Sequence, residues 1–210
     1  MKNLIYSTLA LLFAASLLSW QWSKNQHPTI DKKEVIECLN METQQAYQLE
    51  ASTPAFAAMH PNPLVVNPEN LLGKLIAFEA ADGKQAYAYF IPAKKKTNKY
   101  LIVIQQWWGL NDNVKMESDK YYTDLGNVNV IAVDMYDGKV AATPDSAMKL
   151  MRGANMERMT AIMQGAIKYA GSKAAIYSVG WCFGGMWSLQ TAILAGPQAK
   201  GSVMYYGRPE

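Results

Sequence analysis

The hydrophobic pattern of the chain changes near residue 71. From there on, short apolar and β-branched runs typical of buried strands alternate with longer stretches whose apolar positions recur at helical spacing. Strands are predicted at residues 75–78, 86–91, 100–105, 128–133, 174–179 and 202–206, and helices at 113–125, 156–169 and 186–195. A hairpin followed by alternating strands and helices predicts an α/β fold, in which a mainly parallel sheet carries helices on both faces.

Local signals mark the ends of several of these elements. Asp82-Gly83 is a strong hairpin signal between the first two strands. Thr143-Pro144-Asp145 combines a cap, a proline and an acid in the order favoured at a helix start, so a further helix is predicted there. Gly126 and Gly171 are the expected C-terminal glycines of two helices.

The first 70 residues differ from this regular part. Residues 1–22 combine a short basic start with an uncharged, mostly apolar run, the layout of a signal peptide or an uncleaved N-terminal anchor. A buried N-terminal helix is the alternative. Residues 23–70 form a polar linker interrupted by prolines, with a helix predicted over 32–49. We therefore expect an exported protein, periplasmic or secreted, whose folded domain covers residues 71–210.

Composition excludes several classes of function. The 210 residues have room for one domain with a sizeable core, and 50% of them are hydrophobic while 18% are charged. A net charge of +3 is too small to argue for a nucleic-acid partner. The basic run Lys94-Lys95-Lys96 is expected to be a solvated turn, and membrane contact is expected only through residues 4–20. The sequence does not indicate an oligomeric state.

The candidate chemistry centres on Cys182. Residues 174–185 read AAIYSVGWCFGG, in which a β-branched strand turns abruptly toward a helix, with glycine two positions before and after the cysteine. This is the pattern of a nucleophile elbow, a tight bend that presents a reactive side chain beside the free N–H groups of a helix N-terminus. Such a terminus lowers the pKa of a thiol, and the thiolate is the attacking species. The hypothesis requires a thiol that a substrate can reach; the alternative is a buried structural cysteine.

Other metal-ligating and redox-active residues are few. Two cysteines and two histidines, scattered along the chain, form no ligand cluster, so neither a metal nor another cofactor is expected. In an oxidising compartment Cys38 and Cys182 could form a disulfide, which would consume the nucleophile, so two free thiols are favoured over a redox function. His27 and His60 both precede the predicted sheet, and neither is expected to be a catalytic base.

Four stretches of the chain resemble the dienelactone hydrolase family, a branch of the α/β-hydrolase fold with a cysteine nucleophile. They are VIQQWWGLN at 103–111, VDMY at 133–136, VGWCFGG at 179–185 and YYG at 205–207, in the family's order and spacing over residues 72–210. The resemblance implies a Cys-His-Asp triad with Cys182 as nucleophile, and an oxyanion hole formed by the backbone N–H groups of Phe183 and Trp107. The candidate residues of the substrate pocket are Gln106, Trp108, Tyr136 and Lys139.

The chain also departs from the family pattern. Gln106 stands where the founding enzymes have a glutamate, and a glutamine cannot accept the proton of the thiol. Gly138 and Lys139 stand near the position of a substrate-binding arginine, so a preference for acidic lactones does not follow. In the family the acid and the histidine lie on loops after two further strands. We therefore expect a hydrolase domain that is incomplete at the C-terminus and inactive by itself.

The expected function is hydrolysis of a carboxylic ester or lactone, a small-molecule substrate, through Cys182. This activity, similar to that of a carboxymethylenebutenolidase, requires that the full-length protein supplies the acid and the base. The alternative is a non-catalytic exported protein that keeps the fold in order to bind a ligand. Gln106 and the lack of a suitably placed histidine both favour this alternative.

Overall fold

The computed structural model describes residues 49, 53–55 and 68–207. The segment at 1–22 and most of the linker at 23–70 lie outside the described residues, together with Cys38, His27 and His60. The expectations for export, for membrane contact and for the helix over 32–49 therefore stay predictions. In the described part of the chain, no helix combines the length and the apolar character that crossing a membrane would take.

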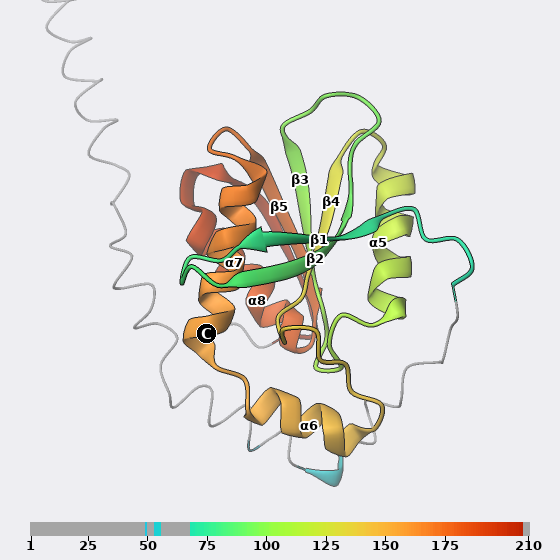
Figure 1. Ribbon diagram of the computed structural model, residues 1–210, viewed down its shortest axis with the longest axis vertical. Helices are drawn as coiled ribbons and strands as arrows, with labels where there is room; N and C mark the ends of the chain where they lie inside the picture. Colours follow the sequence, from blue (N-terminus) through green and yellow to red (C-terminus); the bar gives the residue numbers. More distant parts are fainter. Residues whose placement is uncertain (1–48, 50–52, 56–67, 208–210) are drawn as a thin grey trace, which may run out of the picture. The chain divides into compact units, whose positions relative to one another are not determined.

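Six strands form one sheet, in the order β1-β2-β4-β3-β5-β6 (Figure 1). Their bounds are β1 Lys74–Glu79, β2 Gln85–Ile91, β3 Lys99–Ile104, β4 Asn129–Val133, β5 Ala175–Trp181 and β6 Ala199–Tyr205. β1 and β2 form an antiparallel hairpin and β2 pairs antiparallel with β4, whereas β3, β4, β5 and β6 run parallel to one another. The predicted fold class is confirmed.

Helices cover both faces of this sheet. Within residues 68–207 the α-helices are α5 Asp112–Leu125, α6 Pro144–Arg152, α7 Met156–Ala170 and α8 Phe183–Ala195. Along β3, Ile102 and Ile104 belong to a core shared with α7 and α8, whereas Leu101 and Val103 belong to a second core with Val114 of α5. Figure 1 accordingly shows the strands between α5 and the pair formed by α7 and α8.

The two cores differ in how completely they are covered. On the α7/α8 face the buried cluster includes residues of β1 to β5, and the partly buried Ala199 of β6 packs against it. On the other face α5 packs against β2, β3 and β4. Tyr177 of β5 and Val203 and Tyr205 of β6 nevertheless remain exposed on this face. Among the described strands, β1 and β6 form the two edges of the sheet.

Several predicted element ends are confirmed, but β6 begins at Ala199 and not at the predicted residue 202. The Asn111 side chain caps α5 by accepting a backbone hydrogen bond, and Thr143 begins α6 with a capping box. Gly126 and Gly171 follow the last residues of α5 and α7 as expected. The predicted start of α8 at residue 186 is wrong, because the helix begins at Phe183. Helix propensity, which disfavours glycine, places the start too late, and the close packing described below outweighs it.

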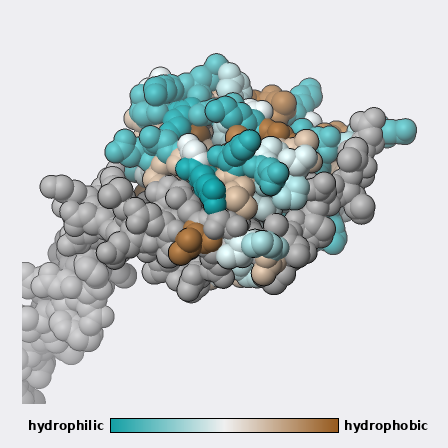
Figure 2. Space-filling view, turned by 90° about the horizontal axis from the view of Figure 1, so that it is seen from below, coloured by the Kyte–Doolittle hydropathy of each residue, from teal (hydrophilic) through white to brown (hydrophobic). Residues whose placement is uncertain are grey.

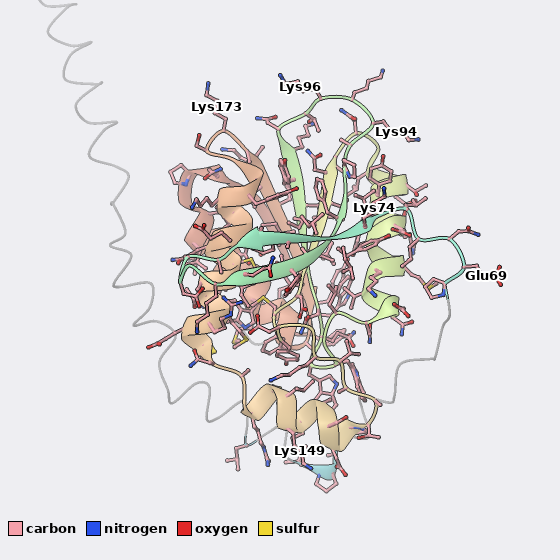
Figure 3. The ribbon with its side chains drawn as sticks, viewed as in Figure 1. Glu69, Lys74, Lys94, Lys96, Lys149 and Lys173 are labelled. Carbon is pink, nitrogen blue, oxygen red and sulfur yellow. The ribbon has the colours of Figure 1, made fainter. Side chains whose placement is uncertain are left out.

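The two ends of the parallel strands have different surroundings. Lys94, Lys96 and Lys173 project from the loops that precede β3 and β5 (Figure 3). All three are exposed, which confirms that the basic run at 94–96 is a solvated turn. Seen from below, the coloured surface is mostly hydrophilic, with hydrophobic residues in separate small areas (Figure 2). The candidate catalytic residues lie at the other end of the strands, where β3, β4, β5 and β6 finish.

Candidate active site

The sheet topology brings two of the predicted site segments together. The chain leaves β3 toward α5 on one face and leaves β5 toward α8 on the other, although the two strands are neighbours. In an open α/β sheet, such a divergence at the carboxyl ends of adjacent strands is the usual place of a ligand site. The segment after β3 contains Gln106, Trp107 and Trp108, and the bend after β5 contains Cys182.

Cys182 occupies the bend between β5 and α8. Its backbone has φ 55° and ψ −119°, a conformation that residues other than glycine rarely adopt, and it is the N-cap of the helix. Its N–H donates a hydrogen bond to the carbonyl oxygen of Tyr205 at 3.0 Å, and its carbonyl oxygen accepts one from the N–H of Gly185 at 2.9 Å. Strand β6 and helix α8 thus hold a strained residue in the geometry of a nucleophile elbow.

The flanking glycines are required by the close approach of backbone segments. A Cβ atom on Gly180 would overlap the backbone of Gly184, and one on Gly184 would overlap the carbonyl oxygens of Ile104 and Gln105 at the end of β3. The sharp bend therefore predicts glycine at both positions correctly. The groups in the way are main-chain atoms, so any side chain would push α8 away from the sheet.

The thiol of Cys182 is covered. The residue is 2% exposed and belongs to the same buried cluster as Trp107, Tyr136 and Phe183. The expectation of a thiol that a substrate reaches directly is wrong for this conformation, because these side chains close around the bend. A substrate can contact Sγ only when covering groups move. Among the described residues Cys182 forms no disulfide, and Cys38 lies outside them.

The two predicted oxyanion donors belong to the segments that follow β3 and β5. Phe183 is the first residue of α8, so its N–H has no acceptor within the helix. Trp107 is fully buried in the loop after β3, with its ring centroid 5.2 Å from that of Trp108. This loop is tied to the segment after β4, because the N–H of Ala141 donates to the Trp108 carbonyl oxygen at 2.8 Å. The role of both N–H groups stays a prediction.

Tyr136 lies beside the nucleophile. Its ring centroid is 5.5 Å from that of Phe183, and the residue is 6% exposed. Its hydroxyl has no hydrogen-bond partner among the described residues. Burial raises the pKa of Tyr136, and the charge of the nearby Cys182 raises it further. The phenol is therefore neutral at ordinary pH and can donate a hydrogen bond.

Buried polar groups shape the segment that carries Tyr136. Asp134, at the end of β4, accepts hydrogen bonds from the N–H groups of Tyr136 and Gly138, and burial raises the pKa of its carboxyl group. The Oε1 atom of Gln105 accepts a hydrogen bond from the N–H of Met135 at 3.3 Å. The ends of β3 and β4 are thereby joined directly below the site.

A second group holds the same segment from outside. Asp137 has φ 52° and accepts hydrogen bonds from Arg158 of α7, at 3.2 Å from Nε and 2.7 Å from Nη2. Arg158 also bonds to the carboxylate of Asp82 at 2.8 Å and to the carbonyl oxygen of Gln85 at 2.6 Å. One guanidinium therefore fastens the turn after β4 to the β1–β2 hairpin.

Gln106 and Tyr206 lie on the more exposed side of the site. The Nε2 atom of Gln106 donates to the Tyr206 hydroxyl at 3.2 Å. Burial, and then the charge of Cys182, raise the pKa of Tyr206, so this second phenol also lies near the thiol. Lys139 is exposed, and its backbone lies against Gly109 in the loop after β3.

Sequence reasoning missed Gln105, Arg158 and Tyr206 as residues of the site. Tyr206 lies in the YYG stretch and could have been found from it, but Arg158 has no local signal. The candidate base is also missing, since residues 68–207 contain no histidine. Within the described part of the chain, no three His, Cys, Asp or Glu side chains are grouped as metal ligands would be.

Comparison with known proteins agrees with this geometry. Residues 85–210 match the model of the dienelactone hydrolase family. The chain is 31% identical over 150 residues to "Protein usf" of Aquifex pyrophilus, a match that covers 66% of this chain and 63% of that protein. It is 29% identical over 150 residues, with the same coverage, to a candidate carboxymethylenebutenolidase of Aquifex aeolicus. The chain thus spans 63% of the length of these two relatives.

The fold is also shared with solved structures. A candidate dienelactone hydrolase from Klebsiella pneumoniae superimposes with a TM-score of 0.51 at 20% sequence identity. The superposition covers 64% of this chain and 61% of that one. The similarity shows that the six strands and their helices are arranged as in an α/β-hydrolase fold.

Proposed function

The chain belongs to the dienelactone hydrolase family, and from this membership we propose that the full-length protein hydrolyses a carboxylic ester or lactone through Cys182. The observation that carries the proposal is the backbone of Cys182, a positive-φ residue held at the N-cap of α8 directly after a parallel strand. Strain at a single non-glycine residue is retained where the surrounding structure requires that side chain in that place.

The reaction would proceed through a thioester. A base removes the proton of Sγ, and the thiolate adds to the carbonyl carbon while the π electrons of the carbonyl bond move to its oxygen. The N–H groups of Phe183 and Trp107 stabilise this oxyanion, each by about 2.7–4 kcal/mol. The C–O bond then breaks and the alcohol leaves with a proton. Water attacks the thioester, the C–S bond breaks, and the acid and the thiol are released.

The base is assigned to a histidine outside residues 68–207, as the family resemblance implies. Gln106 cannot take this role, because an amide does not accept a proton at neutral pH. Its hydrogen bond to Tyr206 instead fixes one side of the site. The resemblance places the acid and the histidine on loops after two further strands, so a protein of residues 1–210 alone is expected to be inactive, and activity is proposed for the full-length protein.

A second candidate function is supported by the coverage of the thiol. A protein that binds a small molecule without turnover needs the pocket but not an accessible sulfur, and Cys182 is 2% exposed.

The proposed location is the same for both functions: residues 1–22 direct export to the periplasm or the exterior, or anchor the protein in a membrane.

The test is ester hydrolysis by the full-length protein with p-nitrophenyl butyrate. We expect Cys182→Ser to lower kcat/KM by about 10³-fold or more, since removal of a nucleophile eliminates the covalent route. Cys38→Ser is the matched control and should change kcat/KM less than twofold, with circular dichroism confirming that both variants fold. Equal rates for the wild type and Cys182→Ser would exclude Cys182 from the mechanism. Saturable ligand binding without any turnover would select the second candidate function.

A further inference from the structure

Tyr136 carries a buried hydroxyl group that the fold itself does not use. Its oxygen has no hydrogen-bond partner among the described residues, although the side chain lies within the main buried cluster. Leaving a buried hydroxyl without a hydrogen-bond partner destabilises the folded state. The neighbouring polar groups of the same turn do have partners, since Asp134 binds two N–H groups and Asp137 binds Arg158. The unpaired hydroxyl therefore stands apart in a segment whose other polar groups are satisfied.

The Tyr136 hydroxyl can donate a hydrogen bond to a substrate, but it does not remove a proton from it. Burial and the charge of Cys182 both raise the pKa of Tyr136, so the phenol keeps its proton throughout the pH range in which a thiolate forms. A neutral phenol presents one O–H donor, which pairs with an oxygen acceptor such as an ether, hydroxyl or carbonyl oxygen.

The surroundings of the site indicate which part of the substrate meets this donor. Gln106 and Tyr206 form the more exposed side, from which a released alcohol would reach solvent. Tyr136 is buried and packs against Phe183, the residue that follows Cys182. An acyl group attached to Sγ remains in the protein after the alcohol has left, so it belongs on the buried side.

We propose that the Tyr136 hydroxyl donates a hydrogen bond to an oxygen atom of the acyl group, and that it thereby selects esters whose acyl chain carries oxygen close to the carbonyl carbon. This inference rests on the proposed function, because it assigns the acyl side from the bond that Cys182 forms. It adds a specificity residue and a substrate class: acyl groups with an α-alkoxy, α-hydroxy or α-oxo substituent.

The test compares two esters that differ in one atom. p-Nitrophenyl methoxyacetate has an ether oxygen where p-nitrophenyl butyrate has a methylene group. In Tyr136→Phe, which keeps the ring and removes the oxygen, the ratio of kcat/KM values for methoxyacetate over butyrate should fall at least fivefold relative to the wild type. Tyr177→Phe, which removes a phenol oxygen on the other face of the sheet, is the control and should keep the wild-type ratio. A smaller fall in Tyr136→Phe, or an equal loss with both esters, would overturn the inference.

A measurement that does not depend on turnover separates this inference from the proposed function. The rate of iodoacetamide labelling of Cys182 is followed by mass spectrometry in the presence of 2-methoxyacetamide or butanamide. The methoxy compound should protect the wild-type thiol at a concentration at least fivefold lower than butanamide does, and this advantage should disappear in Tyr136→Phe. Protection without ester hydrolysis would refute the proposed function and retain the tyrosine donor. Hydrolysis through Cys182 with equal protection by both amides would do the reverse.

Discussion

Where β3 and β5 begin, the loops are exposed and carry the lysines at 94–96 and Lys173 (Figure 3). Where β4, β5 and β6 finish, the chain passes through Asp137, Cys182 and Tyr206, the three residues other than glycine that have positive φ in the described part of the chain. Exposed loops therefore lie at the starts of parallel strands, and turns with strained residues lie at their carboxyl ends. Backbone strain costs about 1–3 kcal/mol for each such residue, and it persists only where surrounding contacts fix it.

The two ends of the parallel strands are therefore stabilised by different contacts. The strained end is supported by close backbone packing at Gly180 and Gly184, by Asp134 and Gln105 below the site, and by Arg158 beside it. The loops that precede β3 and β5 need no such support, because their polar groups are hydrogen-bonded by side chains such as Asn129. Substitutions at the two ends should therefore have very different effects.

The largest effect is expected for Gly180→Ala. Its Cβ would overlap the backbone of Gly184, and main-chain atoms cannot move without displacing α8. We expect the free energy of unfolding to fall by more than about 4 kcal/mol, or folding to fail, in urea titrations followed by circular dichroism. Gly171→Ala is the matched control at the solvated end, where a Cβ meets nothing within 4 Å and only the positive φ is unfavourable. Equal losses in the two variants would remove the distinction between the two ends.

An intermediate effect is expected for Arg158→Met. The variant breaks the bonds to Asp137, Asp82 and the Gln85 carbonyl oxygen, so the turn after β4 loses its attachment to the hairpin. We expect the free energy of unfolding to fall by about 1–3 kcal/mol and kcat/KM of the full-length protein to fall as Tyr136 loses its fixed position. Lys168→Met removes an exposed ion pair with Glu79 and serves as the control. A loss no larger than that of this control would show that the turn does not depend on Arg158.

The smallest effect is expected at the lysine turn. Replacing Lys94, Lys95 and Lys96 together with glutamine should change the free energy of unfolding by less than about 0.5 kcal/mol and leave kcat/KM unchanged. The reason is that these side chains are exposed and far from the carboxyl ends of the strands. A loss of activity comparable to that of Arg158→Met would mean that the solvated end also takes part in the chemistry.

The fold was predictable from the sequence to the extent that signals are local. The alternation of strands and helices, the cap at Thr143 and the glycine that ends α5 each depend on neighbouring residues, and the structure confirms them. The start of α8 was not predictable in this way. Whether Gly184 lies before or within the helix depends on its contact with the end of β3, about 80 residues earlier in the chain. Helix propensity describes single residues and does not include such a contact.

The candidate site was predictable only in part for the same reason. The residues flanking Cys182 indicate the bend, because its geometry is set within five residues. The coverage of the thiol depends on Trp107 and Tyr136, which come from other strand ends. Arg158 reaches the turn after β4 from α7 and bonds to a hairpin about 75 residues away, so only a folded structure reveals it.

The burial of Cys182 also affects how fast its thiol is oxidised. Peroxide converts accessible thiolates to sulfenic acid and then, irreversibly, to sulfinic acid. A residue that is 2% exposed meets such oxidants only when the groups around it separate. Under the proposed function, the movement that admits an ester also admits peroxide, so an ester bound at the site would protect the thiol from oxidation.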